Sequence, residues 1–408
     1  MAATVESAPT PPRQEDERST RETLRSAIEN NIRQYGMVAA LALIVVLFEI
    51  LTGGILLRPL NVSNLVQQNG YILILSIGMV IVIICGHIDL SVGSIAGFVG
   101  AVAAVLMVNN DMPWPIAVVL CLLLGAAIGA WQGFWIAYFG IPSFIVTLAG
   151  MLAFRGLTQY VLEGQSIAPF PRTFQQISSG FLPELDPRSL YHWLTVILGA
   201  IAIVAALWQE VRQRKSQARY GFEVLAFPWF VAKCVGIAGA ITAITLLLAS
   251  YRGVPVVGIL LVILLVIYAF VMRSTIVGRQ VYAVGGNAPA AKLSGVKNER
   301  VTFLVFVNMG LLSALAGLVF AARLNAATPQ AGLNFELEAI AAAFIGGASA
   351  SGGVGTVLGA VVGGLVLGVL NNGMSILGIG TDIQQLIKGL VLLAAVGFDV
   401  YNKKRLGH

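Results

Sequence analysis

Residues 70–108 read GYILILSIGMVIVIICGHIDLSVGSIAGFVGAVAAVLMV, two apolar runs separated by the polar break GHIDLSVGS at residues 86–94. An α-helix needs about 20 apolar residues to cross the roughly 30 Å hydrocarbon core of a bilayer, and each run approaches that length. Irregular backbone at membrane depth is tolerated only where protein covers it or where it lines a watery cavity. The stretch therefore predicts a membrane hairpin whose turn braces or lines a polar path.

A second interrupted segment occupies residues 337–371, where GGASASGG at residues 346–353 separates two apolar runs. Broken apolar segments at corresponding places in two halves of a chain point to the binding site of a transporter. The glycine-rich stretch has no following Lys, so it is not a phosphate loop of the GxxxxGK[ST] type. We therefore expect two broken or re-entrant hairpins, both of which line or brace one translocation path.

Composition places the rest of the chain in a bilayer as well. Of 408 residues, 57% are hydrophobic and only 11% are charged, and the mean hydropathy is +0.86, values far from those of soluble domains. The predicted fold class is an all-α polytopic membrane protein with ten to twelve transmembrane segments. The expected spans are residues 37–57, 70–85, 92–108, 115–139, 142–162, 191–208, 227–250, 254–272, 301–322, 337–348 with 354–371, and 380–400.

Four regions follow from this pattern. Residues 1–20 are rich in Pro, Glu, Arg and Thr and are predicted to be a disordered cytoplasmic tail. Residues 21–36 alternate apolar and charged positions at helical spacing, which predicts an amphipathic helix on the membrane surface. The transmembrane domain is expected over residues 37–401, and residues 402–408 form a basic cytoplasmic tail.

The net charge of +6 is carried by short Lys and Arg clusters beside apolar runs. Counted from a cytoplasmic N-terminus, the clusters at 212–219, 273–300 and 403–405 all fall on the cytoplasmic side, as the positive-inside rule requires. The charge therefore indicates orientation, and we expect membrane lipid and no nucleic acid as a partner. The three cysteines have no metal-ligand spacing, so no metal site is expected.

Motifs that would make the chain an enzyme are missing from its sequence. No GxxxxGK[ST], GxSxG or HExxH run occurs. We therefore expect neither catalysis nor a bound cofactor on this chain alone.

Four runs, in this order, carry a resemblance to a known family. They are HIDLSVGS from His87, GRQVYAVGGN from Gly278 with AAKLSGV from Ala290, GGASASGGVG from Gly346, and LNNG from Leu370. Together they resemble the sugar-importing branch of the ATP-binding-cassette permeases, which includes the ribose, arabinose, galactose and xylose permeases. Many members carry Gly where His87 stands, and the His version is more similar to the xylose and multiple-monosaccharide subset.

The resemblance covers residues 61–405 and implies a homodimeric permease in the bacterial inner (plasma) membrane. It implies a cytoplasmic ATPase subunit whose nucleotide-binding domains hold ATP and Mg²⁺, and a periplasmic sugar-binding protein. An extra membrane pair, implied by residues 205–255, also agrees with the xylose subset. The expected function is import of a monosaccharide, xylose or several aldoses, by alternating access.

Polar residues at the breaks are the candidates for the substrate path. An intramembrane carboxylate such as Asp89 costs roughly 2.5–3.5 kcal/mol on insertion scales, which makes it a functional candidate. Capping of the following helix is the alternative role for Asp89 and Ser91. Amides offer the donors and acceptors that sugar hydroxyls require, although they also cap helix ends. The predicted path residues are His87, Asp89, Ser91, Ser94, Asn371, Asn372 and Gln384.

The loop of residues 273–300 alternates glycines with apolar residues, which is unlike a mobile spacer. We interpret it as a short helix that docks into a partner's groove, with an ordinary structured loop as the alternative. The resemblance implies that this loop is the coupling element that contacts the ATPase. The predicted coupling residues are Gly278, Tyr282, Gly285, Gly286, Asn287, Leu293, Ser294 and Gly295.

Two other functions stay open from the sequence. A proton-coupled secondary sugar transporter would use His87 and Asp89 as a proton relay. A non-transporting membrane scaffold or enzyme subunit would give no solute flux. Three further charges, Glu49, Arg155 and Lys388, fall within or near spans, where such groups pair or extend to the interface.

Overall fold

The computed structural model describes residues 36–185, 189, 191–220 and 227–405, which form helices joined by loops. Nine of the described helices are long and apolar enough to cross a membrane, so the predicted all-α polytopic fold is confirmed. These spans are α2 (Pro59–Ile84), α3 (Val92–Ala104) with the π-helix η1 (Val105–Asn109), α4 (Trp114–Ala137), α5 (Ser143–Val161), α7 (Trp193–Arg219), α8 (Phe227–Ala249), α9 (Val256–Ser274), α12 (Asn298–Leu324) and α14 (Val357–Ile376). The remaining described helices are Gly36–Leu51, α6 (Arg172–Ser179), α10 (Ile276–Gly286), α11 (Ala288–Leu293), α13 (Phe335–Ile345) and α15 (Thr381–Arg405).

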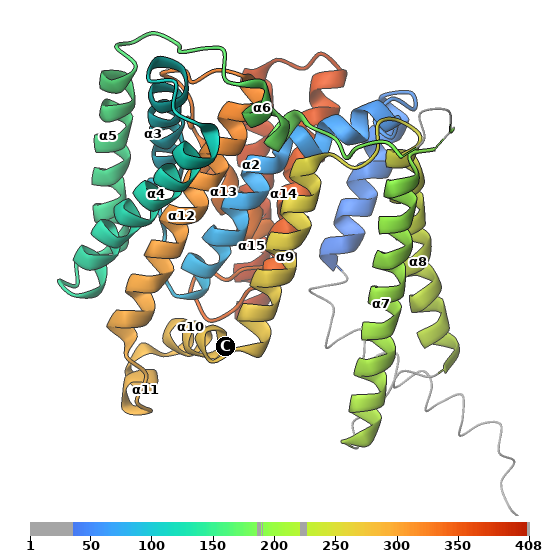
Figure 1. The fold of residues 1–408 in the computed structure, drawn as a ribbon. Coiled ribbons are helices and arrows are strands. Elements are labelled where there is room, and N and C mark those ends of the chain that lie inside the picture. The colour runs from blue at the N-terminus through green and yellow to red at the C-terminus, as the bar shows by residue number, and fades with distance from the viewer. Residues whose placement is uncertain (1–35, 186–188, 190, 221–226, 406–408) are drawn as a thin grey trace, which may run out of the picture.

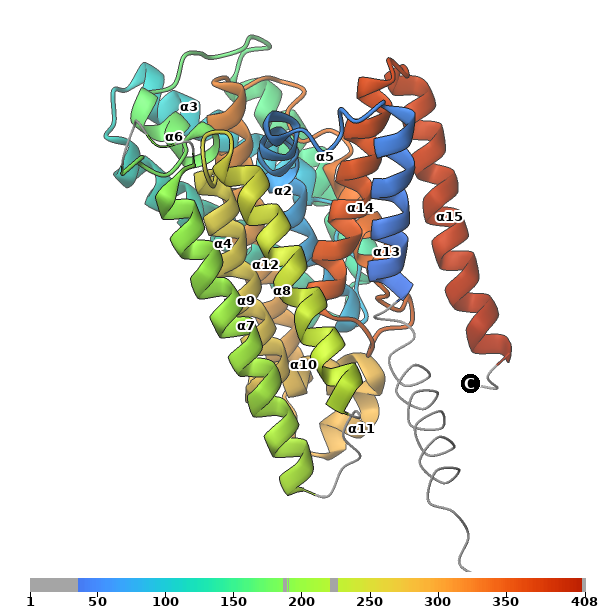
Figure 2. The same cartoon turned by 90° about the vertical axis from the view of Figure 1, so that its right-hand side faces the viewer.

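Helix α2 lies inside the bundle, where it packs against α9, α12, α13 and α14 (Figures 1 and 2). Every residue from Ile72 to Ile84 is buried. A helix that is apolar on all faces is stable only when protein or lipid surrounds it, and here other helices surround it. The first broken segment therefore begins at the centre of the molecule.

Helix α12 approaches α4 closely through small residues. A Cβ atom added at Gly125 would meet the carbonyl oxygen of Gly310, and one added at Gly129 would meet that of Phe306. Such small residues let the backbones of membrane helices approach, since packing stabilises their association in lipid. Because α12 also packs against α2, the pair α4 and α12 forms a fixed wall beside the first broken segment.

The two broken segments form two hairpins. Hairpin 1 consists of α2, the turn at residues 85–91 and α3, and hairpin 2 consists of α13, the turn at residues 346–356 and α14. Helices α10 and α11 lie at one end of the bundle and α6 lies at the other, and we call these the α10 end and the α6 end (Figure 1). The end of α2 in hairpin 1 and the turn of hairpin 2 both contact α10.

Two helices extend beyond their predicted bounds. Helix α2 begins at Pro59 and not at residue 70, because proline suits the first helical turn and the polar Asn61 finds a partner in the bundle. Helix α7 continues to Arg219, so the basic segment 212–219 is a helix end and not a loop.

Parts of the predicted organisation fall outside the described residues. These are the tail 1–20, the interfacial helix over 21–36 apart from Gly36, and the last residues of the basic segment 402–408.

Candidate functional site

The turns of the two hairpins and α10 meet at one place. We call it the three-way junction, formed by residues 84–86, 352–355 and 282–286. The backbone N–H of Gly353 donates to the carbonyl of Ile84 at 2.9 Å, which joins hairpin 2 to hairpin 1 directly. Three segments that are far apart in the sequence therefore meet at one place.

Helix α10 is attached to both hairpins through Gly285 and Tyr282. A Cβ added at Gly285 would overlap the carbonyl oxygen of Ile84, so only glycine fits there. The hydroxyl of Tyr282 donates to the carbonyl of Gly355 at 2.7 Å. Burial raises the pKa of Tyr282, so this hydroxyl stays a donor at neutral pH. A displacement of α10 would therefore act on both turns together.

A buried side-chain network holds the turn of hairpin 1. Asp89 Oδ1 accepts from the backbone N–H of Ser91 at 2.8 Å and from its hydroxyl at 2.6 Å. Gln132 Nε2 on α4 donates to Ser91 Oγ at 2.8 Å, and all three side chains are buried. An aspartate that bonds the backbone two residues on forms a local turn. Asp89 thus fixes the turn before α3, and Ser91, the N-cap residue of α3, makes no side-chain capping bond to the described helix.

His87 and Ser94 lie on either side of this network. The ring of His87 lies 5.7 Å from that of Phe306, centroid to centroid. Within the described residues no hydrogen bond joins His87 to Asp89. Ser94 is buried, and its hydroxyl has no hydrogen-bond partner in the described chain. An unpartnered buried hydroxyl carries a desolvation cost.

A buried carboxylate on α13 joins three helices. Glu336 is 5% exposed, and its Oε1 lies 3.9 Å from Arg155 Nη2 on α5. Its Oε2 has no hydrogen-bond partner among the described residues. A Cβ added at Gly93 would overlap this oxygen, so the carboxylate lies against the start of α3. The sequence offered one signal for Glu336, an acid beside an apolar run, but the predicted span began one residue later.

The predicted amides lie elsewhere, on α14 and α15. Asn372 exchanges two hydrogen bonds with Asn61 at 2.7 and 3.1 Å, and Gln384 Nε2 donates to the carbonyl of Ile379 at 2.8 Å. Asn371 Oδ1 is buried without a partner in the described chain. At 1.5 Å per residue, Asn371 lies about 20 Å along α14 from the turn of hairpin 2. The predicted path residues therefore form two separate groups.

The three charges left unassigned by the sequence have identifiable contacts. Lys388 Nζ on α15 lies 2.8 Å from Glu338 Oε1 on α13. Arg155 on α5 faces α13 as described above, and Glu49 accepts the backbone N–H of Leu57 at 2.9 Å. Helix α13 is therefore joined to α5 on one side and to α15 on the other by ion pairs.

The predicted coupling loop forms two short helices in place of the single helix expected. Asn287 Oδ1 accepts the backbone N–H of Ala290 at 3.0 Å and so caps α11. The Ser294 hydroxyl donates to the carbonyl of Ala290 at 3.0 Å, and Gly295 ends the turn with a φ of +84°. Gly278 lies against the end of α9. These predicted coupling residues therefore help to set where α10 and α11 begin and end.

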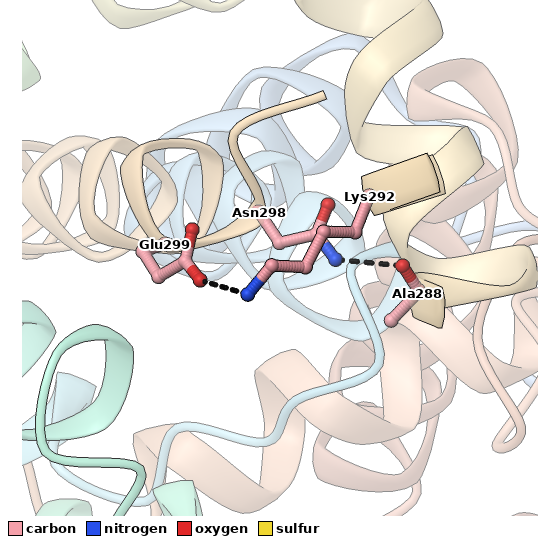
Figure 3. Close-up of polar contacts among 4 residues, drawn as sticks. All are labelled: Ala288, Lys292, Asn298 and Glu299. Atoms are coloured by element: carbon pink, nitrogen blue, oxygen red, sulfur yellow. Dashed lines mark hydrogen bonds and ion pairs between the residues drawn. The ribbon is translucent and has the colours of Figure 1, made fainter. Parts of the chain in front are cut away.

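Helix α11 is fastened to the first turn of α12 (Figure 3). Lys292 Nζ lies 3.0 Å from Glu299 Oε1, and Asn298 Nδ2 donates to the carbonyl of Ala288 at 2.7 Å. Leu293, at the end of α11, is 91% exposed. An exposed leucine on a rigidly held helix is suited to contact with a partner.

Comparisons with known proteins identify one family and several relatives. Residues 61–396 match the family described as branched-chain amino acid transport system, permease component. The chain is 42% identical over 377 residues to the xylose transport system permease protein of Haemophilus influenzae. The aligned residues cover 92% of this chain and 98% of that protein. It is 33% identical over 345 residues to the ribose import permease protein of Escherichia coli K12, covering 85% of this chain and 86% of that one. No solved structure matches the chain.

Proposed function

Because the chain belongs to the family of branched-chain amino acid transport system permease components, we propose that it is the membrane permease of an ATP-driven sugar importer. The solute is a monosaccharide, with xylose or several aldoses as first candidates, since the relatives above are named for xylose and ribose transport. The chain itself carries no phosphate loop, so ATP and Mg²⁺ belong to a partner subunit.

The three-way junction is the observation that carries this proposal. A push on α10 reaches Ile84 of hairpin 1 through Gly285 and reaches hairpin 2 through Tyr282. Hinge and shear motions of packed helices are a common way to convert a local push into a change of access. In the proposed mechanism, ATP binding and hydrolysis displace α10, and both hairpins then alternate between outward and inward access.

The proposed orientation follows the basic residues. The α10 end faces the cytoplasm, where the ATPase contacts α10 and α11 with Leu293 at the centre of the contact. The α6 end faces the periplasm and receives the sugar-binding protein. A second copy of the chain completes the permease in the bacterial inner membrane.

For the substrate path we propose buried polar atoms that have no partner in the described chain. Six side chains of the described residues carry such an atom, and of these we assign Ser94, Glu336 and Asn371 to the path. Sugar hydroxyls both donate and accept, so they can satisfy a serine hydroxyl, a carboxylate and an amide oxygen in turn. Asp89 and Asn372 instead support the path, because their side chains are occupied by Ser91 and Asn61.

The proton-coupled alternative is not favoured. A relay needs two titrating groups in contact, and in the described chain Asp89 bonds Ser91 while the ring of His87 faces Phe306. The ATP-driven proposal therefore predicts uptake that an uncoupler does not abolish.

Reconstitution tests the proposal directly. The chain is placed in proteoliposomes with its ATPase and its binding protein, and uptake of labelled xylose, ribose, arabinose, galactose and glucose is measured with and without ATP. We expect uptake that requires all three components. Uptake by the chain alone that an uncoupler abolishes would contradict the proposal.

Leu293→Ser tests the proposed ATPase contact. We expect a several-fold loss of ATP-dependent uptake at unchanged thermal stability, because a 91% exposed leucine contributes little to folding. Tyr220→Ser is the matched control, since Tyr220 is 73% exposed at the end of α7, outside α10 and α11. Equal losses in both variants would remove the ATPase contact from α11.

A further inference from the structure

A cavity of about 470 Å³ opens between α9, α10 and α12. Its inner wall is apolar and includes Ile81 of α2, Val271 of α9, Val281 of α10 and Val305 of α12. The outer side chain Leu304 is 46% exposed, so the cavity opens to the side of the bundle. A cavity on the side of a membrane-spanning bundle faces lipid.

The residues that α12 contributes lie along one face of that helix. Lys297, Arg300, Leu304 and Asn308 follow each other at spacings of three and four. At 1.5 Å per residue this face is about 16 Å long. At its inner end the hydroxyl of Tyr268 donates to Asn308 Oδ1. The groove is therefore basic at its mouth, apolar along its length and closed by a polar pair.

The two basic residues at the mouth are free. Lys297 and Arg300 are exposed, and neither has an ion pair or hydrogen bond with the described residues. The neighbouring Lys292 differs, because it is paired with Glu299. Basic residues at a cytoplasmic membrane end are ordinary, but an apolar cavity directly behind two unpaired ones is not.

We propose that this groove binds an anionic phospholipid of the cytoplasmic leaflet. The phosphate of the head group contacts Lys297 and Arg300, and one acyl chain lies along Val305 and Ile81. Basic pockets between membrane helices on the cytoplasmic side bind anionic head groups in this way. The proposal rests on the orientation given above. The acyl chain would also contact Val281, next to Tyr282, and so would support α10 at the three-way junction.

Native mass spectrometry of the purified full-length chain tests the site. Phosphatidylglycerol and phosphatidylethanolamine are titrated into wild type, into the double variant Lys297→Gln/Arg300→Gln, and into the control Arg273→Gln/Arg279→Gln. The control removes two exposed basic residues of the same end that do not line the cavity. We expect wild type to prefer phosphatidylglycerol and the first variant to bind it about 30-fold more weakly. The control should bind as wild type does.

A second variant tests the apolar part without changing charge. Val271→Trp fills the groove, so phosphatidylglycerol binding should fall, and glycerol phosphate, which has the head group without acyl chains, should not compete in wild type. Equal binding of the two lipids, or equal loss in both double variants, would overturn the proposal. The measurement uses neither ATPase nor sugar, so its outcome is independent of the import assay.

Discussion

The turn of hairpin 1 is joined to α4 by side chains, whereas the turn of hairpin 2 is held by backbone hydrogen bonds and by side chains of its own and of α10. In hairpin 1 the buried groups of Asp89, Ser91 and Gln132 bond each other. The first turn is therefore fixed to α4.

In hairpin 2 the N–H of Ser349 donates to the carbonyl of Val354 at 3.0 Å. The hydroxyls of Ser349 and Ser351 bond each other, and Tyr282 of α10 bonds Gly355. The second turn is therefore fixed to itself and to α10.

This difference indicates which changes each turn tolerates. When a side chain in a hydrogen-bonded network is substituted, the loss of stability depends on how many of its hydrogen bonds the new side chain keeps. A close backbone contact at a glycine allows no such graded loss of stability, because any side chain there forces the two backbones apart. We therefore expect the turn of hairpin 1 to depend on residue chemistry and the contact between Gly285 and Ile84 to depend on space alone.

The largest expected effect is that of Gly285→Ala. An added methyl would overlap the carbonyl of Ile84, and overpacking of this kind costs about 1–3 kcal/mol or more. Uptake should fall about ten-fold or more, and the thermal unfolding temperature in detergent should fall with it. Gly286→Ala is the matched control, since its added Cβ would meet nothing within 4 Å apart from its chain neighbours and the backbone of α10 itself.

Backbone entropy sharpens this pair, because replacing glycine by alanine at a compatible φ stabilises a protein by about 0.4–1 kcal/mol, and Gly286 does not have a positive φ. Gly286→Ala should therefore be neutral or slightly stabilising, opposite in sign to Gly285→Ala. If both variants lost uptake equally, the close contact with Ile84 would not be the reason.

Asp89 gives the next effect and tests the side-chain network. Asp89→Ala leaves the backbone N–H of Ser91 without its acceptor, although the Ser91 hydroxyl can still donate to Gln132 Oε1 at 3.1 Å, and should cost about 1.5–3 kcal/mol of stability, the range for hydrogen bonds to charged groups. Asp89→Asn keeps an acceptor oxygen, so it should cost clearly less. Denaturation of the two variants in detergent, with and without Gln132→Leu, measures the coupling. Additive losses for Asp89 and Gln132 would show that the network is not a unit.

Arg155 and Glu336 test the ion pair that joins α13 to α5. Arg155→Gln leaves a buried carboxylate without its cation, so it should lower stability by about 1 kcal/mol, a value reduced because Arg155 is 33% exposed. Glu336→Gln removes the charge itself and should cost less. The double variant should recover part of the loss of Arg155→Gln, and a loss equal to the sum would contradict the pairing.

Hydropathy located both breaks and most of the spans, because each depends on a local run of apolar residues, but the segments predicted over 37–57 and 380–400 are not among the nine candidate spans of the described residues. The start of α2 was missed, since Asn61 is polar and its partner Asn372 lies 311 positions away. The three-way junction could not be predicted either. Nothing in the sequence near Gly285 indicates that Ile84 will fill the space beside it.

For the candidate site, too, the sequence indicated the segments but not the contacts between them. Glycine and polar residues marked both breaks and the loop between α9 and α12, and the structure brings Gly285 against Ile84 and Tyr282 against Gly355. Gln132 and Arg155 were not predicted as site residues, because a single polar residue in an apolar span does not reveal which helix it faces. Their roles depend on helix packing, which hydropathy does not encode.

Tyr282→Phe is expected to have the smallest effect, and it separates the two attachments of α10. The change removes one hydrogen bond to the carbonyl of Gly355 and nothing else, so it should cost about 1 kcal/mol and lower coupled uptake a few-fold. Because hairpin 1 contacts α10 through Gly285, its attachment should survive in this variant. ATPase activity without sugar should then rise relative to uptake, since hairpin 2 follows α10 less closely. Unchanged coupling at reduced stability would mean that Tyr282 only stabilises the fold and that the backbone contacts of hairpin 2 transmit the displacement alone.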